Sequence, residues 1–241
     1  MQQRRLLRQP MMGGGAAAGT SPGTSNLISW WKLEEASGTR NDSHGTNHLA
    51  DNNTVLNDAA GKKSNAASFV TANSEWLSIA SNASLQTGDI DFTVGLWVKV
   101  TGASTVRFAG KADAAGSASE WYLEGLEFSG QYYPTFSIKN NSLALNNDII
   151  NANTWAFVVA WHDATANKIY IQVDNGSPAS ENLASGPTAA ADGFSIGRAG
   201  ERAANYMGGL IDEVFLYKKV LTAAQRTWLY NAGAGRTYGD L

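Results

Sequence analysis

The sequence has 241 residues, of which 43% are hydrophobic and 16% are charged, with a net charge of −3 and no cysteine. This length allows one large domain or two small ones. The lack of cysteine excludes disulfides and thiolate metal sites. Abundant Asn, Ser, Thr, Gly and Ala favour a sheet-rich domain of extracellular type over a helical enzyme. No apolar run approaches the roughly 18–20 residues of a membrane span.

Residues 1–26 differ in composition from everything that follows. They contain Arg4, Arg5 and Arg8 but no acidic residue, which leaves 15 basic and 21 acidic residues in the remainder, a net charge of −6. This acidic remainder offers no basic stripe for nucleic acid. The Gly/Ala-rich stretch has little to bury, so we expect a flexible N-terminal arm. Because "RRLLRQPMMGGG" lacks the apolar run of about 7–15 residues found in signal peptides, we expect no standard secretion.

From residue 27 onward, short apolar or alternating runs recur between clusters of Gly, Asn, Asp and Ser, as β-strands do. In "FTVGLWVKV", the residues Phe92, Val94 and Leu96 share one face with the valines that follow them, and Trp97 takes the other face. Asp174-Asn175-Gly176 predicts a tight turn. The runs lie at 27–33, 66–70, 76–80, 92–100, 121–128, 134–140, 155–163, 168–173, 194–199 and 210–219.

One stretch near the C-terminus has helical character. In "LTAAQRTWLYNAG", Thr222 is suited to cap the start of a helix and Gly233 to end it. No repeat of fixed period is visible, which disfavours propellers and solenoids. We therefore predict an all-β domain over residues 27–235 with one short C-terminal helix, an arm at 1–26 and a tail at 236–241.

Four blocks, in this order, resemble the laminin-G-like, concanavalin A-like jelly roll, in the branch found in bacterial and phage surface proteins. They are "SWWKLEEASGTRNDSHGTNHL", "SFVTANSEWLSIASNASLQTGDIDFTVGLWVKV", "NTWAFVVAWHDATANKIYIQVDNG" and "FSIGRAGERAANYMGGLIDEVFLYKKVLTAAQRTWLYNAG". The resemblance implies a two-sheet jelly-roll sandwich. In such a sandwich large aromatic side chains fill the space between the sheets.

Three aromatic residues near a loop-rich stretch are candidates for stacking on a sugar. They are Trp121, Tyr132 and Tyr133. The alternative, which we favour for most aromatic residues of such a fold, is packing in the core.

The sequence offers little for catalysis. Glycoside cleavage needs two carboxylates roughly 5–10 Å apart, and the Glu-x-Asp-x-Glu strand of the related glucanases is absent. Glu120 and Glu124 share a strand face but are four residues apart, and Glu127 has the other parity. No Gly-x-Ser-x-Gly, His-Glu-x-x-His or phosphate-loop motif occurs. We expect no enzymatic activity.

The resemblance also implies a structural calcium ion, held where the loop after the first strand meets the closing strand. The implied ligands are Asp42, the Gly45 carbonyl, Asn47 and Asp212. Calcium takes six to eight such oxygen ligands. The alternative is ordinary turn chemistry, in which the Asp42 carboxylate accepts hydrogen bonds from nearby backbone N–H groups.

These observations favour a virion structural protein: a capsid-decoration, head-fibre or tail-associated jelly roll, made in the host cytoplasm and displayed on the virion surface. Arg4, Arg5 and Arg8 of the arm would dock into another capsid or tail protein. Many copies on a lattice, and contact with host glycans, fit this role. The alternatives are a bacterial extracellular carbohydrate-binding or adhesion module and, last, a glycosidase or lyase. For the arm, the alternatives are a disordered linker of a larger secreted protein or a misassigned start.

Overall fold

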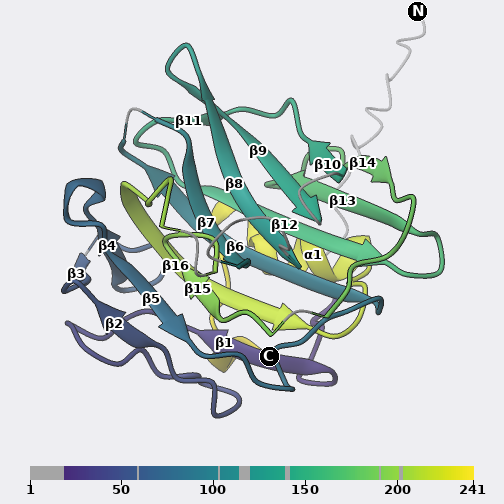
Figure 1. The fold of residues 1–241 in the computed structure, drawn as a ribbon, viewed down its shortest axis with the longest axis horizontal. Coiled ribbons are helices and arrows are strands. Elements are labelled where there is room, and N and C mark those ends of the chain that lie inside the picture. The colour runs from purple at the N-terminus through teal and green to yellow at the C-terminus, as the bar shows by residue number, and fades with distance from the viewer. Residues whose placement is uncertain are drawn as a thin grey trace, which may run out of the picture.

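The chain folds into two antiparallel β-sheets that lie face to face (Figure 1). The computed structural model describes residues 19–58, 60–102, 104–113, 120–138, 142–189, 191–200 and 203–241. Arg4, Arg5 and Arg8 therefore lie outside the described residues. Each pair of neighbouring strands in the described ranges is antiparallel. The prediction of an all-β sandwich with one C-terminal helix is confirmed.

Sheet 1 has eight strands in the order β14-β13-β12-β6-β16-β4-β3, with β1 also paired to β16. Its strands are β1 (Leu27–Trp31), β3 (Leu56–Asp58), β4 (Ala66–Phe69), β6 (Phe92–Val100), β12 (Ala156–Asp163), β13 (Lys168–Val173), β14 (Ala179–Asn182) and β16 (Gly209–Tyr217). The closing strand β16 thus lies beside strands from the beginning of the chain.

Sheet 2 also has eight strands, in the order β10-β9-β8-β7-β15-β5-β2, with β11 paired to β9. Its strands are β2 (Ala50–Asn52), β5 (Trp76–Ile79), β7 (Val106–Lys111), β8 (Trp121–Phe128), β9 (Gln131–Ile138), β10 (Ser142–Leu145), β11 (Ile150–Asn151) and β15 (Phe194–Ile196).

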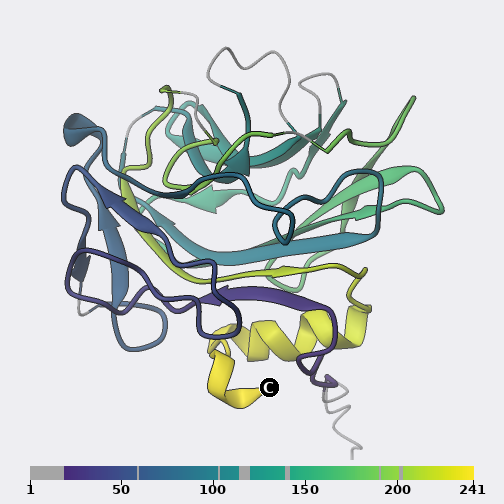
Figure 2. The same cartoon turned by 60° about the horizontal axis from the view of Figure 1, so that its bottom comes forward.

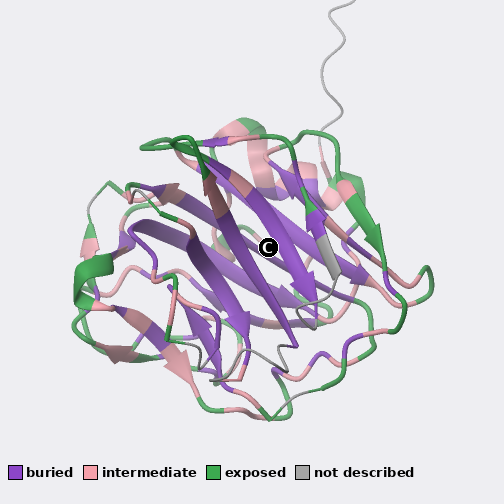
Figure 3. Ribbon diagram, turned by 45° about the horizontal axis from the view of Figure 1, so that its top comes forward, coloured by how far each residue is buried: buried purple, intermediate pink, exposed green. Residues whose placement is uncertain are grey.

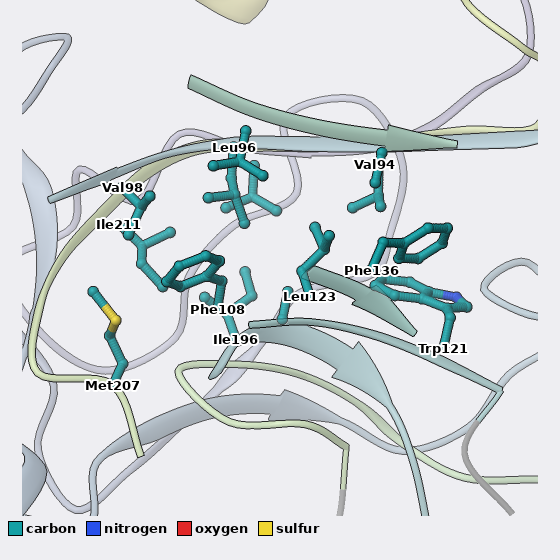
Figure 4. Close-up of a cluster of buried hydrophobic side chains, with 14 of the residues drawn as sticks. Val94, Leu96, Val98, Phe108, Trp121, Leu123, Phe136, Ile196, Met207 and Ile211 are labelled. Carbon is teal, nitrogen blue, oxygen red and sulfur yellow. The ribbon is translucent and has the colours of Figure 1, made fainter. Parts of the chain in front are cut away.

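The main hydrophobic core fills the space between the two sheets (Figure 4). Val94, Leu96 and Val98 of β6 enter it from sheet 1, as their alternation predicts, and Leu123 and Phe136 enter it from sheet 2. The central strands are therefore buried along most of their length, and exposed residues gather at loops and hairpin ends (Figure 3). Burial of apolar area on this scale is the main source of stability in such a fold.

A second hydrophobic cluster covers the outer face of sheet 1. Here α1 (Ala223–Tyr230) packs through Leu229 against the outward-facing Trp30, Trp97 and Phe215 (Figure 2). The predicted cap Thr222 accepts a hydrogen bond from the Gln225 backbone N–H and forms a capping box. The helix ends earlier than Gly233, because Asn231 takes the left-handed conformation there.

Short 3-10 turns complete the backbone. They are η1 (Thr71–Asn73), η2 (Asn231–Gly233) and η3 (Tyr238–Asp240). Tyr238 and Leu241 of the C-terminal tail pack against the cluster that α1 covers. Within the described ranges, no helix has the length and apolar content needed to cross a membrane.

Residues 19–26 run along the same outer side of sheet 1, next to α1 (Figure 2). The Thr20 backbone N–H donates to the Ala224 carbonyl, and Tyr217 donates its hydroxyl to the Gly23 carbonyl at 2.9 Å. A β-carbon at Gly19 would collide with the backbone of Trp228. The chain therefore enters the domain on the helix side, across the sandwich from sheet 2.

Candidate ligand-binding site

Two of the three aromatic residues predicted to contact a ligand are part of the core. Trp121 is fully buried and points between the sheets (Figure 4). Tyr132 is 1% exposed and donates its hydroxyl to the Gly102 carbonyl. Packing is thus the role that their contacts support, because alternation along β8 and β9 turns both side chains inward.

Tyr133 has the opposite parity and faces outward from sheet 2. It pairs across the ladder with Leu126, which lies two residues before Phe128 on the same face. Tyr133 is half-buried, whereas Phe128 is 70% exposed. These side chains line an open cleft of about 430 Å³, which we call the hairpin cleft. Its lining residues are Thr105, Leu126, Glu127, Phe128, Tyr133, Leu145 and Asn147.

The hairpin cleft combines aromatic rings with polar groups at its rim. The Tyr133 hydroxyl donates a 3.3 Å hydrogen bond to Gln131, and Asn147 is exposed beside the rings. Glu127 accepts from the Gly130 backbone N–H at 2.7 Å, which holds the hairpin turn. An exposed ring with nearby amides and hydroxyls can stack on the apolar face of a sugar while its hydroxyls find partners. The sequence analysis missed Phe128, although its parity with Leu126 in the run 121–128 pointed to it.

Glu120 and Glu124 each have structural partners. One carboxylate oxygen of Glu120 accepts from the backbone N–H groups of Thr87 and Gly88. Its other oxygen lies 3.8 Å from Lys111 Nζ. Glu124 pairs with Arg107 at 3.2 Å, and both side chains are almost fully buried. These contacts give both carboxylates a structural role in the fold.

The loop after β1 brings three of the four predicted calcium ligands together. The Asp42 carboxylate accepts backbone N–H bonds from Trp30, His44 and Asn47, all at 3.0–3.1 Å. A β-carbon at Gly45 would lie 2.8 Å from Asp42 Oδ2. The Asn47 side-chain oxygen accepts from Asn82 and Ser84. The Asp42 bonds are those of the alternative interpretation, turn chemistry.

Asp212, the fourth predicted ligand, lies on the other side of β1. Trp31 of β1 pairs with Asp42 on one edge and with Val214 of β16 on the other. No hydrogen bond or charge contact among the described residues joins Asp42 to Asp212. The charged groups that interact with Asp212 are Glu34, Lys62 and Glu213 instead.

Asp212 and Glu213 occupy a bulge where β16 changes partners. Residues up to Ile211 pair with β4, and those from Val214 onward pair with β1. Ile211 and Val214 both face the intersheet core, so the two residues between them turn to the outer face. Glu213 has a φ of 49°, which is the local cost of this turn.

Both carboxylates of the bulge are fully buried, and Thr237 of the C-terminal tail lies against Glu213. Asp212 accepts from the Lys63 backbone N–H at 2.8 Å, and Glu213 accepts from the Trp30 indole. One oxygen of each carboxylate has no hydrogen-bond partner in the described part of the chain. Loss of solvation is the main reason that the pKa of Asp212 rises to about 7 and the pKa of Glu213 to about 8.

Of the predicted calcium ligands, Asp212 has an unpartnered carboxylate oxygen, and Glu213, which the sequence analysis did not name as a ligand, offers a second one beside it. Carboxylate oxygens are ligands that calcium prefers, and a cation would offset their buried charge. No group of three or more His, Asp or Glu side chains placed to hold a metal occurs among the described residues.

Two stacked antiparallel sheets, with a helix on one outer face and an aromatic cleft on the other, define a jelly-roll sandwich of the lectin type. The family described as the concanavalin A-like lectin/glucanases superfamily matches residues 71–225, well over half of the chain. The protein therefore belongs to this superfamily, as its resemblance indicated. Curated protein sequences give no significant match.

Solved structures with the same fold come from several kinds of protein. The binding domain of Paraclostridial mosquitocidal protein 1 is similar with a TM-score of 0.67 and 13% identity, over 86% of this chain and 52% of that one. Domain 4 of AbnA, an extracellular arabinanase from Geobacillus stearothermophilus solved with arabinotriose, gives 0.62 and 18%, over 88% and 99%. The botulinum neurotoxin serotype D ligand-binding domain, solved with N-acetylneuraminic acid, gives 0.62 and 10%, over 86% and 51%.

This chain thus spans about half of the two toxin domains and nearly all of the arabinanase domain. At these identities the likeness concerns the fold alone.

Proposed function

We propose that the protein is a non-catalytic glycan-binding domain and that the hairpin cleft is its ligand site. The observation that carries the proposal is the pair of outward-facing rings, Tyr133 and Phe128, beside the exposed Asn147. An exposed aromatic surface of this kind marks an interaction site more often than a packing defect. The superfamily, and relatives solved with arabinotriose or N-acetylneuraminic acid, support a sugar as the ligand.

The test is a glycan array read with the intact chain, followed by calorimetric titration of the best ligand. We expect Tyr133→Ala and Phe128→Ala each to weaken binding roughly tenfold or more, because aromatic contacts contribute about 0.5–1.5 kcal/mol beyond the area they bury. Neither change should alter the circular dichroism spectrum, since both side chains lie at the surface.

The matched control is Tyr170→Ala, which removes a half-buried tyrosine from sheet 1. Tyr170 stacks on Trp161 at 4.9 Å, so this variant loses a ring contact of similar size away from the hairpin cleft. Full glycan binding by Tyr170→Ala and loss by Tyr133→Ala support the proposal. Equal losses in both, or no ligand on the array, contradict it.

We further propose that the domain is displayed on a virion surface and fastened through residues 1–26 to another capsid or tail protein. Two observations support this. Residues 1–26 carry three arginines and no acid, and residues 19–26 enter the domain beside α1, across the sandwich from the hairpin cleft. An attachment through the helix side leaves the ligand site facing outward.

A bacterial extracellular carbohydrate-binding or adhesion module is the second candidate. The arabinanase domain that this chain matches over almost its full length favours it. The two candidates differ in where the protein is found: in purified virus particles for the first, and on the bacterial surface or in the medium for the second.

We also propose a structural calcium ion at the acidic bulge, with Asp212 and Glu213 as its ligands. Glu34 is the further carboxylate whose charge acts on both residues. Calcium bound there would offset the buried negative charge between β16 and the C-terminal tail. Asp42, Gly45 and Asn47 would then stabilise the neighbouring loop without contacting the ion.

A further inference from the structure

A second, smaller cleft lies at the other end of sheet 2, beside β5 and β15. It has a volume of about 230 Å³, and its lining includes Trp76, Ser78, Ile79, Phe194 and Arg198. Ligand pockets for drug-sized molecules have roughly 300–1,000 Å³. This cleft, which we call the Arg198 cleft, therefore has room for one small ring and not for an oligomer.

Arg198 is held in place over the Trp76 ring. Its guanidinium carbon lies 4.0 Å from the ring centroid, and its Nε donates to the Gly200 carbonyl at 2.9 Å. The same carbonyl accepts from Ser195, and a β-carbon at Gly200 would collide with the Ala112 backbone, so the loop has little freedom. A guanidinium fixed through Nε keeps its two terminal nitrogens available for a planar, two-oxygen acceptor.

Among the described residues that line the Arg198 cleft, the charged side chain is that of Arg198. None of the described residues that line it is acidic. The indole N–H of Trp76 has no acceptor among the described residues, although it is shielded from solvent. A buried donor without a partner costs free energy that an incoming acceptor can return. The cleft thus combines a positive charge with a buried N–H donor that has no acceptor among the described residues.

We propose that the Arg198 cleft binds the carboxylate of an acidic sugar. One arginine matches the single charge and planar shape of a carboxylate, whereas a doubly charged phosphate would call for further cations. Trp76 and Ile79, which are both half-buried, supply the apolar surface that a sugar ring needs. The site is separate from the hairpin cleft and rests on the proposed function only in taking the ligand to be a sugar.

The test follows the indole N–H signals of the eight tryptophans by NMR while sodium D-glucuronate is added to the intact chain. The Trp76 signal is assigned by its loss in Trp76→Phe. We expect glucuronate to shift it in a saturable manner, and glucose and the glucuronic acid methyl ester to leave it unchanged. We expect Arg198→Gln to weaken glucuronate binding roughly tenfold or more. Arg198→Lys should weaken it less, because Lys keeps the positive charge but lacks the paired guanidinium N–H groups that bind both carboxylate oxygens.

Binding of the acid but not of its ester supports the proposal without any variant, so it remains testable where Arg198→Gln does not fold. No shift at saturating glucuronate, an equal response to glucose, or equal displacement by inorganic sulfate overturns it. Tyr133→Ala should bind glucuronate normally. That result would show that the two clefts bind independently, so that the proposal for one cleft can be contradicted while the proposal for the other stands.

Discussion

At the scale of single residues, the most consequential polar contact is the ion pair between Lys111 and Glu120. Both side chains are completely buried, with Nζ 3.8 Å from the carboxylate. Lys111 also donates to the Asp192 carbonyl at 2.7 Å, and Glu120 holds the backbone of Thr87 and Gly88. The pair therefore ties the loop between β5 and β6 to the end of sheet 2.

We predict that Glu120→Gln lowers the free energy of unfolding by about 3 kcal/mol, because it removes the carboxylate charge that lies beside the buried Lys111 ammonium. Urea denaturation measures this change. The double variant Lys111→Met with Glu120→Gln should recover part of the loss, since it removes the buried ammonium charge as well. A single variant as stable as the parent chain would show that the ion pair has no such role.

The candidate site shows how far single residues could be predicted from sequence. The run 121–128 indicated a strand, and Tyr132 and Tyr133, between that run and the next, were named as candidates for ligand contact; Tyr133 does line a cleft. Alternation shows that Tyr132 and Tyr133 face opposite ways, but it does not say which face is covered. That depends on sheet 1 packing against sheet 2, which no local pattern encodes. The same limit applies to the Arg198 cleft, whose residues lie more than 100 positions apart in the chain.

At the scale of elements, the bulge in β16 gives stability a particular dependence on pH in the calcium-free protein. The ordinary pKa values of Asp212 and Glu213 are 3.8 and 4.5, and burial raises them to about 7 and about 8. Between pH 4 and pH 8 the folded state therefore holds protons that the unfolded state has released. Stability from these groups is greatest below pH 4, falls as pH rises through this window, and is level above it.

We predict that the free energy of unfolding in chelator falls by on the order of a few kcal/mol between pH 5 and pH 8. Asp212→Asn and Glu213→Gln should each flatten this slope, because neither amide titrates. Lys62, Lys63 and Glu34 are the other charged residues near the bulge, and they remain in both variants. Urea titrations at four pH values measure the slope, and a parent chain with no slope contradicts the prediction.

Bound calcium should oppose this loss of stability at high pH. Its ligands must be ionised, so added calcium should stabilise the parent chain more at pH 8 than at pH 5. The Asp212→Asn variant should respond much less. An equal melting temperature with calcium and with chelator at pH 8 would remove the proposed ion and leave the pH prediction unaffected.

The sequence analysis missed β2, β3, β7, β10, β11 and β14, and three of these strands are short and polar. The segments β2, β3 and β14 read ADN, LND and ASEN, and most of their residues are exposed or half-exposed. Each lies at the edge of its sheet, where one neighbour is enough and no alternation of apolar residues is required. The long central strands, buried on both sides, carried the signal that made the fold predictable.

At the scale of the whole molecule, the two outer faces have different roles. The outer face of sheet 1 is covered by α1, the C-terminal tail and residues 19–26. The outer face of sheet 2 carries both clefts. One face of the domain is thus covered by its own terminal segments, and the opposite face carries the candidate ligand sites. A module attached through the first face would leave those sites accessible, as display on a surface requires.

We predict that truncations at the N-terminus separate attachment from folding. Removing residues 1–18 leaves the contacts of residues 19–26 intact, so the melting temperature and glycan binding should not change. Removing residues 1–25 also deletes the hydrogen bonds that link Thr20, Pro22 and Gly23 to Ala224, Lys219 and Tyr217. At about 0.5–1.5 kcal/mol each, their loss should lower the melting temperature by several degrees.

Incorporation into virus particles, measured by immunoblot after sedimentation, should be lost in both truncations if residues 1–18 make the attachment. A variant with Arg4, Arg5 and Arg8 changed to Gln tests the charges alone, with Lys62→Gln and Lys63→Gln as a control that removes positive charge from the body. Incorporation of the chain that begins at residue 19 contradicts an anchoring arm. Loss of glycan binding in that same chain contradicts the separation of attachment from ligand binding, because residues 19–26, where the described chain begins, lie across the sandwich from both clefts.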